Sequence, residues 1–310
     1  MIHETCRQDT MWDSLDSSPL FIILVCEYFK KTNDLGFIKK ILVGVEKAYL
    51  WSTVYGDNDG DHFLEYDAAP NGLVHHCWKD SRDGMTNEQN ELPQYPIAPV
   101  EVQGYYYSAL MSLSELYKSL GKEVVSQNFQ ERADSIKKKF NKDFWMEKEG
   151  FFAMALDGNK DQITVISSNV GHALWSRIIE EEKVESVVKR LLEKDIFTKF
   201  GIRTLSDKMG NFDAFSYHRG SIWPFDNWFF AEGLEKYGHN DEANKVRENV
   251  LNALTELVNP LECYTYSDGE LGIKMHTWDN KVLYPEKIQA WTLGAMYSFV
   301  SKIKNAPEPL

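Results

Sequence analysis

Apolar residues recur at helical spacing along most of the chain, so the sequence predicts a protein built from helices. The serines and the proline at Ser17-Ser18-Pro19 supply an N-cap and a proline at the first helical position. A helix then runs until Asn33-Asp34 stops it. The predicted helices are 20–31, 36–51, 100–120, 122–140, 168–179, 181–194, 224–237, 240–258 and 286–302.

The order of these helices predicts an all-α (α/α)6 toroid. The turns at residues 121, 180 and 238 follow one another at nearly equal intervals, which indicates a repeated helical hairpin. The first helix of each pair is the more apolar, and the second carries one apolar stripe, so we expect an inner and an outer ring. Nine helices are predicted where six hairpins need twelve. The toroid is therefore expected to be incomplete, as a single domain over 1–310 with an inserted active-site loop at about 55–97.

Composition and charge exclude several classes of function. The net charge of −13 opposes binding to a phosphate backbone. No apolar run is long enough to span a bilayer, and residues 1–4 lack the layout of a signal peptide, so a cytoplasmic protein without membrane contact is expected. The four cysteines, at 6, 26, 77 and 263, form no CxxC pair and are expected to be free thiols. Nine tryptophans are compatible with a carbohydrate ligand.

The segment 217–227 concentrates the chemistry expected of a sugar site. It brings His218, Arg219, Trp223 and Asp226 together around Gly220 and Pro224. Flat rings stack on a sugar, and polar groups fix its hydroxyls. A structural role is an open alternative for each residue: a satisfied histidine, a structural cation, or an acid that starts a helix.

Two acidic residues on loops are candidates for acid and base catalysis. Asp80 lies between Lys79 and Arg82 and beside Trp78, and Glu262 directly follows a predicted helix. Hydrolysis of a glycosidic bond needs such a pair of carboxyl groups. As the alternative, Asp80 or Asp83 caps a turn.

The run Asp57-Asn58-Asp59-Gly60-Asp61 suggests a calcium loop but fails its template. The sixth position is His62 rather than glycine, and the twelfth is Ala68 rather than glutamate. No metal and no cofactor are therefore expected.

Several motifs, in order along nearly the whole chain, resemble the catalytic domain of the amylo-α-1,6-glucosidase, or glycogen-debranching, group of toroid glycosidases. The motifs are Ser14 to Phe21, Asp57 to Tyr66, Gly72-Leu73 with Trp78-Lys79-Asp80-Ser81, Pro96-Ile97-Ala98 with Glu101 to Tyr105, Ser168 to Trp175, Gly201 to Leu205, Tyr217 to Asn227, and Gln289-Ala290-Trp291.

This resemblance implies an inverting exo-hydrolase that releases terminal α-linked glucose, with Asp80 as general acid and Glu262 as general base. The assignment of Glu262 follows from Pro260-Leu261-Glu262, which is shifted by one residue from the family's Pro-Glu-Leu-like motif. The sugar site would be lined by Asp16, Trp78, Glu101, His218, Arg219, Trp223, Asp226, Gln289 and Trp291. From residue type alone, Gln289 and Trp291 could instead pack an inner helix, and Glu286 could interact with a helix dipole.

Two departures from the family pattern leave alternatives open. Glu286 and Lys287 precede Gln289 where relatives often have a cysteine and a small residue, so Glu286 is a rival base. The family domain usually begins upstream with further helices, so a partner chain or self-association is expected to cover the open N-terminal edge. The alternatives to an α-glucan hydrolase are a catalytically impaired sugar-binding toroid and a hydrolase of the same fold acting on mannosylglycerate, trehalose or a rhamnoside.

Overall fold

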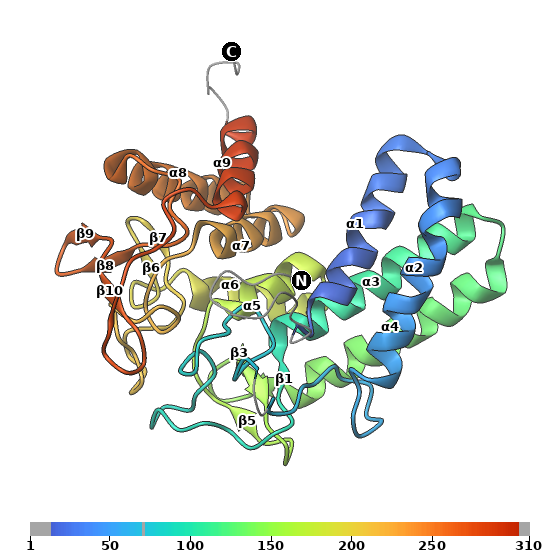
Figure 1. Ribbon diagram of the computed structural model, residues 1–310, viewed down its shortest axis with the longest axis horizontal. Helices are drawn as coiled ribbons and strands as arrows, with labels where there is room; N and C mark the ends of the chain where they lie inside the picture. Colours follow the sequence, from blue (N-terminus) through green and yellow to red (C-terminus); the bar gives the residue numbers. More distant parts are fainter. Residues whose placement is uncertain (1–13, 70–71, 304–310) are drawn as a thin grey trace.

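A computed structural model describes residues 14–69 and 72–303, and nine α-helices form the frame of this part of the chain (Figure 1). The helices are α1 (Ser17–Thr32), α2 (Leu35–Val54), α3 (Val100–Ser119), α4 (Glu123–Asp143), α5 (Asn169–Ser176), α6 (Glu181–Leu191), α7 (Pro224–Lys236), α8 (Asn240–Leu257) and α9 (Ala290–Lys302).

The helices pack as an inner and an outer layer. Packing between the inner helices runs from α1 to α3, α5, α7 and α9, while α2, α4 and α8 pack on α1, α3 and α7, and α6 follows α5 (Figure 1). The sequence explains the division, because α3 buries fifteen of its twenty residues, whereas α4 buries six of twenty-one. Five inner and four outer helices among the described residues confirm the expectation of an incomplete α/α toroid.

Left-handed residues end several helices where the sequence predicted turns. Asn33 closes α1 at φ 54°, and Gly121 and Gly238 adopt φ 72° and 87° between the helices of their pairs. Several boundaries differ from prediction. Helices α2 and α4 end three residues later than predicted, at Val54 and Asp143, and α6 ends three residues earlier, at Leu191. Helix α1 begins at Ser17, so Pro19 is its third residue, and α5 ends early because Arg177 is left-handed at φ 65°.

The start of α9 is the largest correction to the predicted helices. Residues 286–289 are not helical, and Gln289 instead extends at φ −113° and ψ 129°. Its backbone N–H donates to the Pro260 carbonyl at 3.1 Å. This bond holds the segment beside the loop of Glu262, and the helix begins only at Ala290.

Short strands, which the sequence analysis did not predict, brace the loops between the helices. They are β1 (Ala98–Pro99), β2 (Trp145–Met146), β3 (Phe151–Phe152), β4 (Ala155–Leu156), β5 (Gln162–Ile163), β6 (Phe197–Thr198), β7 (Gly201–Ile202), β8 (Thr265–Ser267), β9 (Glu270–Gly272), β10 (Met275–His276) and β11 (Val282–Leu283). All pairings between them are antiparallel: β1–β4–β5 form one sheet, and the others form two-stranded ribbons.

The inserted segment is tied to the frame at its two ends. An antiparallel bridge joins Tyr66 to Ile97, and the Gln103 side chain on α3 bonds both backbone groups of Leu64, at 2.8 and 2.7 Å. A further bridge joins Ile222 to Tyr264, which brings the segment 217–227 beside the loop of Glu262. The loop of Glu262 thus lies beside the 217–227 segment, and the inserted segment that carries Asp80 is attached to the inner helix α3.

Apolar side chains are exposed on the first and last inner helices of the arc. Leu24 on α1 is 67% exposed, and Tyr297 and Trp291 on α9 are 76% and 51% exposed. Such a face is typical of a surface that another helix covers. A partner chain or self-association at this edge stays a prediction.

Three of the expected free thiols fall within the described residues, at Cys26, Cys77 and Cys263; all are buried and unpaired with one another, and Cys6 lies outside these residues. No helix in this part of the chain is both long and apolar enough to cross a membrane.

Candidate active site

Aromatic rings from two distant loops pack together at one end of the inner helices. Trp78, from the inserted segment, makes edge contacts with His218 and Trp223 at centroid distances of 5.6 and 5.7 Å. His218 stacks on Trp223 at 5.1 Å. Because the two segments are far apart in the sequence, with four helices between them, the toroid rather than local sequence assembles this wall.

A buried lysine lies beneath these rings. Lys79 is fully buried, and its ammonium donates to the Thr204 carbonyl at 2.7 Å. Burial lowers the pKa of Lys79 to about 8, although the charges of Asp226 and Glu101 oppose the shift. Burial raises the pKa of Glu101 to about 7, against a hydrogen bond from Asn169.

Asp226 is oriented by a relay of buried side chains. A carboxylate can only accept, so His172 Nε2 donates to Asp226 Oδ1 at 2.7 Å. The other ring nitrogen, Nδ1, then accepts from the Tyr105 hydroxyl. Burial lowers the pKa of His172, which favours this neutral ring. The relay leaves Asp226 Oδ2 buried without a hydrogen-bond partner among the described residues.

A second relay orients His218. The Ser81 hydroxyl donates to Asp83 at 2.8 Å, so His218 Nδ1, 2.8 Å from the same hydroxyl, donates to it. The Ser81 N–H lies farther from Nδ1, at 3.4 Å. In this tautomer Nε2 is an acceptor, and it too is buried without a partner in the described chain. Burial lowers the pKa of His218 to about 4, so the ring is neutral at neutral pH.

Arg219 is engaged by the loop rather than directed at these rings. Its guanidinium donates to Asp83 and to the Asn211 carbonyl, at 2.9 Å in each case. Burial opposes the ionisation of Asp83, but the Ser81 hydrogen bond and the Arg219 charge lower its pKa. These bonds hold the loop that carries Asp83, and a contact of Arg219 with a sugar stays a prediction.

Glu262 is held by three groups from different parts of the chain. The Tyr217 hydroxyl donates to it, the Glu286 backbone N–H lies 3.4 Å from Oε2, and the Gln289 amide lies 3.5 Å from Oε1. Burial raises the pKa of Glu262, and the neighbouring charge of Glu286 adds to the rise. Trp291, half exposed, packs against Phe225 at 4.5 Å.

Asp80 lies in the electrostatic field of the same groups. Burial raises the pKa of Asp16, and the charge of Asp80 adds to that rise. Asp80 also raises the pKa of Tyr217, after the larger effects of burial and of Cys263 and Glu262. The acid and base candidates therefore share Tyr217 as a neighbour. Inversion requires the two carboxyl groups to stand roughly 6.5–9.5 Å apart, and this separation stays a prediction for Asp80 and Glu262.

Several buried polar atoms of this cluster lack a hydrogen-bond partner among the described residues, and they include Trp78 Nε1, Glu101 Oε1, Asp226 Oδ2 and His218 Nε2. Leaving a buried polar atom unpaired costs about 1–3 kcal/mol, and such atoms are typically satisfied by a ligand or water. The indole N–H is a donor and the other three atoms are acceptors, a combination that suits a polyhydroxylated ligand.

Sequence reasoning missed four residues that complete this arrangement: Lys79, Tyr105, His172 and Tyr217. Each lay inside a motif already singled out. His172 is a polar residue directly before the apolar pair Ala173 and Leu174, but sequence spacing alone does not show that it is buried.

Comparison with known proteins relates the chain to sugar hydrolases. A family model described as the mannosylglycerate hydrolase MGH1-like glycoside hydrolase domain matches residues 7–278. The chain is 26% identical to the mannosylglycerate hydrolase of Rubrobacter radiotolerans over 184 residues, which are 56% of this chain and 40% of that protein. It is 25% identical to the periplasmic trehalase of Salmonella typhimurium over 174 residues, or 54% of this chain and 29% of that protein.

Among solved structures, the fold is similar to the GH63 mannosylglycerate hydrolase of Thermus thermophilus in complex with Tris. The TM-score is 0.54 at 16% identity, over 66% of this chain and 46% of that one. This likeness shows the fold alone. The chain spans less than half the length of each of these three relatives.

Proposed function

Because the chain belongs to the mannosylglycerate hydrolase MGH1-like glycoside hydrolase family, we propose that it hydrolyses a small α-linked glycoside, with mannosylglycerate as the first substrate to test. The family match replaces the predicted glycogen-debranching group with the mannosylglycerate hydrolase-like family of glycoside hydrolases. The glycoside hydrolase family is shown, but the comparisons do not support the debranching of an α-glucan. They favour the alternative that named mannosylglycerate and trehalose.

The observation that carries the proposal is the set of buried polar atoms without a partner among the described residues, which includes Trp78 Nε1, Glu101 Oε1, Asp226 Oδ2 and His218 Nε2. In the proposed reaction a sugar ring lies against Trp78, with its hydroxyl groups bonded to Glu101, Asp226 and His218. The His218 Nε2 and the two carboxylate oxygens accept from hydroxyl groups, and the indole N–H donates to one.

Asp80 is the proposed general acid and protonates the glycosidic oxygen as the bond to the sugar breaks. Glu262 is the proposed general base and removes a proton from the water that attacks the opposite face, which inverts the anomeric centre. The bonds from Tyr217 and Gln289 orient Glu262 for this step. The Glu286 backbone contributes to the same orientation, so Glu262 is preferred over its rival as the base. The mechanism requires no cofactor.

A second candidate substrate is trehalose, which the likeness to a trehalase favours. A sugar-binding toroid without catalysis is the candidate from another class, and it predicts binding without release of sugar. A cytoplasmic location stays a prediction.

The test is a panel of mannosylglycerate, trehalose, an α-rhamnoside and a branched α-glucan, assayed for released sugar with the purified chain. Asp80→Asn and Glu262→Gln are each expected to lower kcat by about 10²–10⁴-fold. Asp241→Asn, on the exposed start of α8, makes the same atomic change and is expected to leave activity unchanged. Equal turnover by Asp80→Asn would refute the mechanism, and sugar binding without any turnover by the unaltered chain would favour the binding toroid.

A further inference from the structure

The carboxylates of the acidic loop at the start of the inserted segment converge and are held in place by backbone hydrogen bonds. One carboxylate oxygen from each of Asp57, Asp59 and Asp61 lies within 4.8 Å of the others. Backbone N–H groups fix the carboxylates: Gly60 and His62 donate to Asp57 at 2.9 and 3.1 Å. The Asp61 N–H donates to the Asp59 carboxylate at 3.1 Å, and the Phe63 N–H donates to the Asp61 carboxylate at 2.8 Å.

A fourth carboxylate faces the same point from the interior. The Glu65 side chain is 0% exposed, and its Oε1 has no hydrogen-bond partner in the described part of the chain. Burial raises the pKa of Glu65, although the hydrogen bond from Lys160 opposes the rise. Four anionic groups in this small volume repel one another, so a cation is needed to hold them together.

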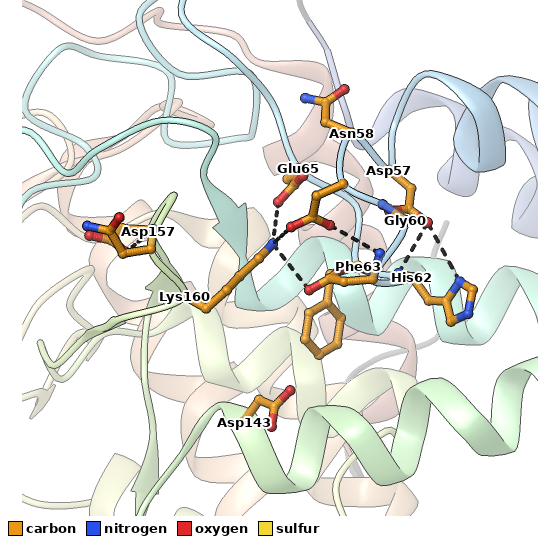
Figure 2. A network of polar contacts seen from close by, with 12 residues as sticks. Asp57, Asn58, Gly60, His62, Phe63, Glu65, Asp143, Asp157 and Lys160 are labelled. Carbon is orange, nitrogen blue, oxygen red and sulfur yellow. Dashed lines mark hydrogen bonds and ion pairs between the residues drawn. The ribbon is translucent and has the colours of Figure 1, made fainter.

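The cation at this point is the ammonium group of Lys160, from the turn between β4 and β5 (Figure 2). Its Nζ lies 2.7 Å from Asp59, 3.2 Å from Asp61 and 2.7 Å from Glu65. Carboxylate oxygens that converge on one centre are also ligands of calcium, which takes about six to eight oxygens in all, including backbone carbonyls and water. Lys139 pairs with Asp61 from the outer helix at 2.9 Å and neutralises part of the remaining charge.

The turn that carries Lys160 also contacts the far end of the inserted segment. The Gly158 N–H donates to the Gln94 carbonyl at 2.8 Å, and the Asn159 amide donates to the Gln94 side chain at 2.9 Å. A Cβ at Gly158 would lie 2.1 Å from the Tyr95 carbonyl oxygen, so the contact requires glycine. One turn thus joins the beginning and the end of the segment that carries Trp78 and Asp80.

We propose that the acidic loop of Asp57, Asp59, Asp61 and Glu65 is a divalent-cation-type site whose cation is supplied by the chain itself, as the Lys160 ammonium. The failed calcium template of the sequence thus has a structural counterpart, since the carboxylates converge as metal ligands do and a lysine takes the metal's place. Removing this ammonium creates a site for calcium. The proposal does not depend on the identity of the substrate.

The test compares thermal unfolding of the full chain in calcium chloride and in potassium chloride of equal ionic strength. Lys160→Met, which keeps most of the unbranched side chain but removes its charge, is expected to lower Tm. Calcium at about one hundred times its dissociation constant should then raise the Tm of this variant by roughly 5 °C. Lys160→Arg keeps the charge and should behave as the unaltered chain does. Lys142→Met, an exposed matched control on α4, should show no calcium response.

The double variant Lys160→Met with Asp59→Asn should lose the calcium response, because it lacks one of the proposed ligands. A calcium response in the unaltered chain as large as that of Lys160→Met, or none in Lys160→Met, would overturn the proposal. If Lys160→Met does not fold alone, refolding in calcium should recover it. Failure to recover while Lys160→Arg folds normally would also overturn the proposal.

Discussion

We predict that buried His75 makes the stability of the inserted segment sensitive to acid. The ring is 0% exposed, with Nδ1 2.8 Å from the Tyr66 hydroxyl and Nε2 3.1 Å from the Arg82 carbonyl. The carbonyl can only accept, so Nε2 carries the proton and Nδ1 accepts from Tyr66. Burial lowers the pKa of His75 from 6.5 to about 4, against the bond to Arg82. The neutral ring therefore holds the loop two residues beyond Asp80.

The sign and size of the effect follow from this pKa. A base with a lowered pKa in the folded state contributes stability above pH 6.5, and this stability is lost as the pH falls toward 4. The difference between these two pKa values corresponds to at most roughly 3.4 kcal/mol, of which about 2 kcal/mol is lost by pH 5. His75→Gln keeps a donor for the Arg82 carbonyl and removes the titration.

Urea unfolding of the unaltered chain and of His75→Gln at pH 7.5 and pH 5 measures this contribution. The unaltered chain should lose about 2 kcal/mol more of its unfolding free energy than the variant between these values. Taking the difference between the two proteins removes the opposite effect of Glu101, whose raised pKa increases stability over the same range as the pH falls. Equal losses in the two proteins, or a pKa of 6.5 measured for His75 by NMR, would refute the reasoning.

Two further predictions concern packing and the loop. Gly233→Ala should destabilise the chain by about 1–3 kcal/mol, because its Cβ would lie 2.9 Å from Leu174 Cβ and the Trp175 nitrogen, where α5 and α7 pack. As the matched control, the Cβ of Gly294→Ala on α9 would meet no neighbouring atom within 4 Å, so this change should stabilise the chain by up to about 1 kcal/mol. Thermal unfolding measures both variants, and equal effects of Gly233→Ala and Gly294→Ala would contradict this account. Arg219→Met should lower the free energy of unfolding by about 3 kcal/mol, because it leaves buried Asp83 without its cation. The double variant with Asp83→Asn should recover part of this loss in the same unfolding assay. No recovery would show that loss of the ion pair is not the cause.

Helix positions could be predicted because they depend on local periodicity. Gly121 and Gly238 end helices through their own backbone preferences, so neighbouring residues sufficed to place the breaks. The start of α9 could not be predicted, because it depends on the bond from Gln289 to Pro260, which only the folded chain brings together. The short strands likewise depend on tertiary pairing, as in β1 with β4, which are separated in the sequence by both α3 and α4.

The candidate site shows the same limit. Motifs identified Asp80, Trp78 and Glu101 as residue types suited to a sugar, but residue type does not determine burial. Lys79 would ordinarily be exposed, and only the structure shows it buried against the Thr204 carbonyl. Arg219 and His218 are adjacent in sequence, yet their partners differ, since one engages Asp83 and the other reaches it through Ser81.

The most direct test of the proposed mechanism is the anomeric form of the sugar first released from the substrate that the panel identifies. Proton NMR of the unaltered chain and of Asp80→Asn measures it before mutarotation. The account predicts that the β-anomer forms first from an α-glycoside, and that Asp80→Asn lowers the rate by about 10²–10⁴-fold. First release of the α-anomer, or an undiminished rate in Asp80→Asn, would contradict it.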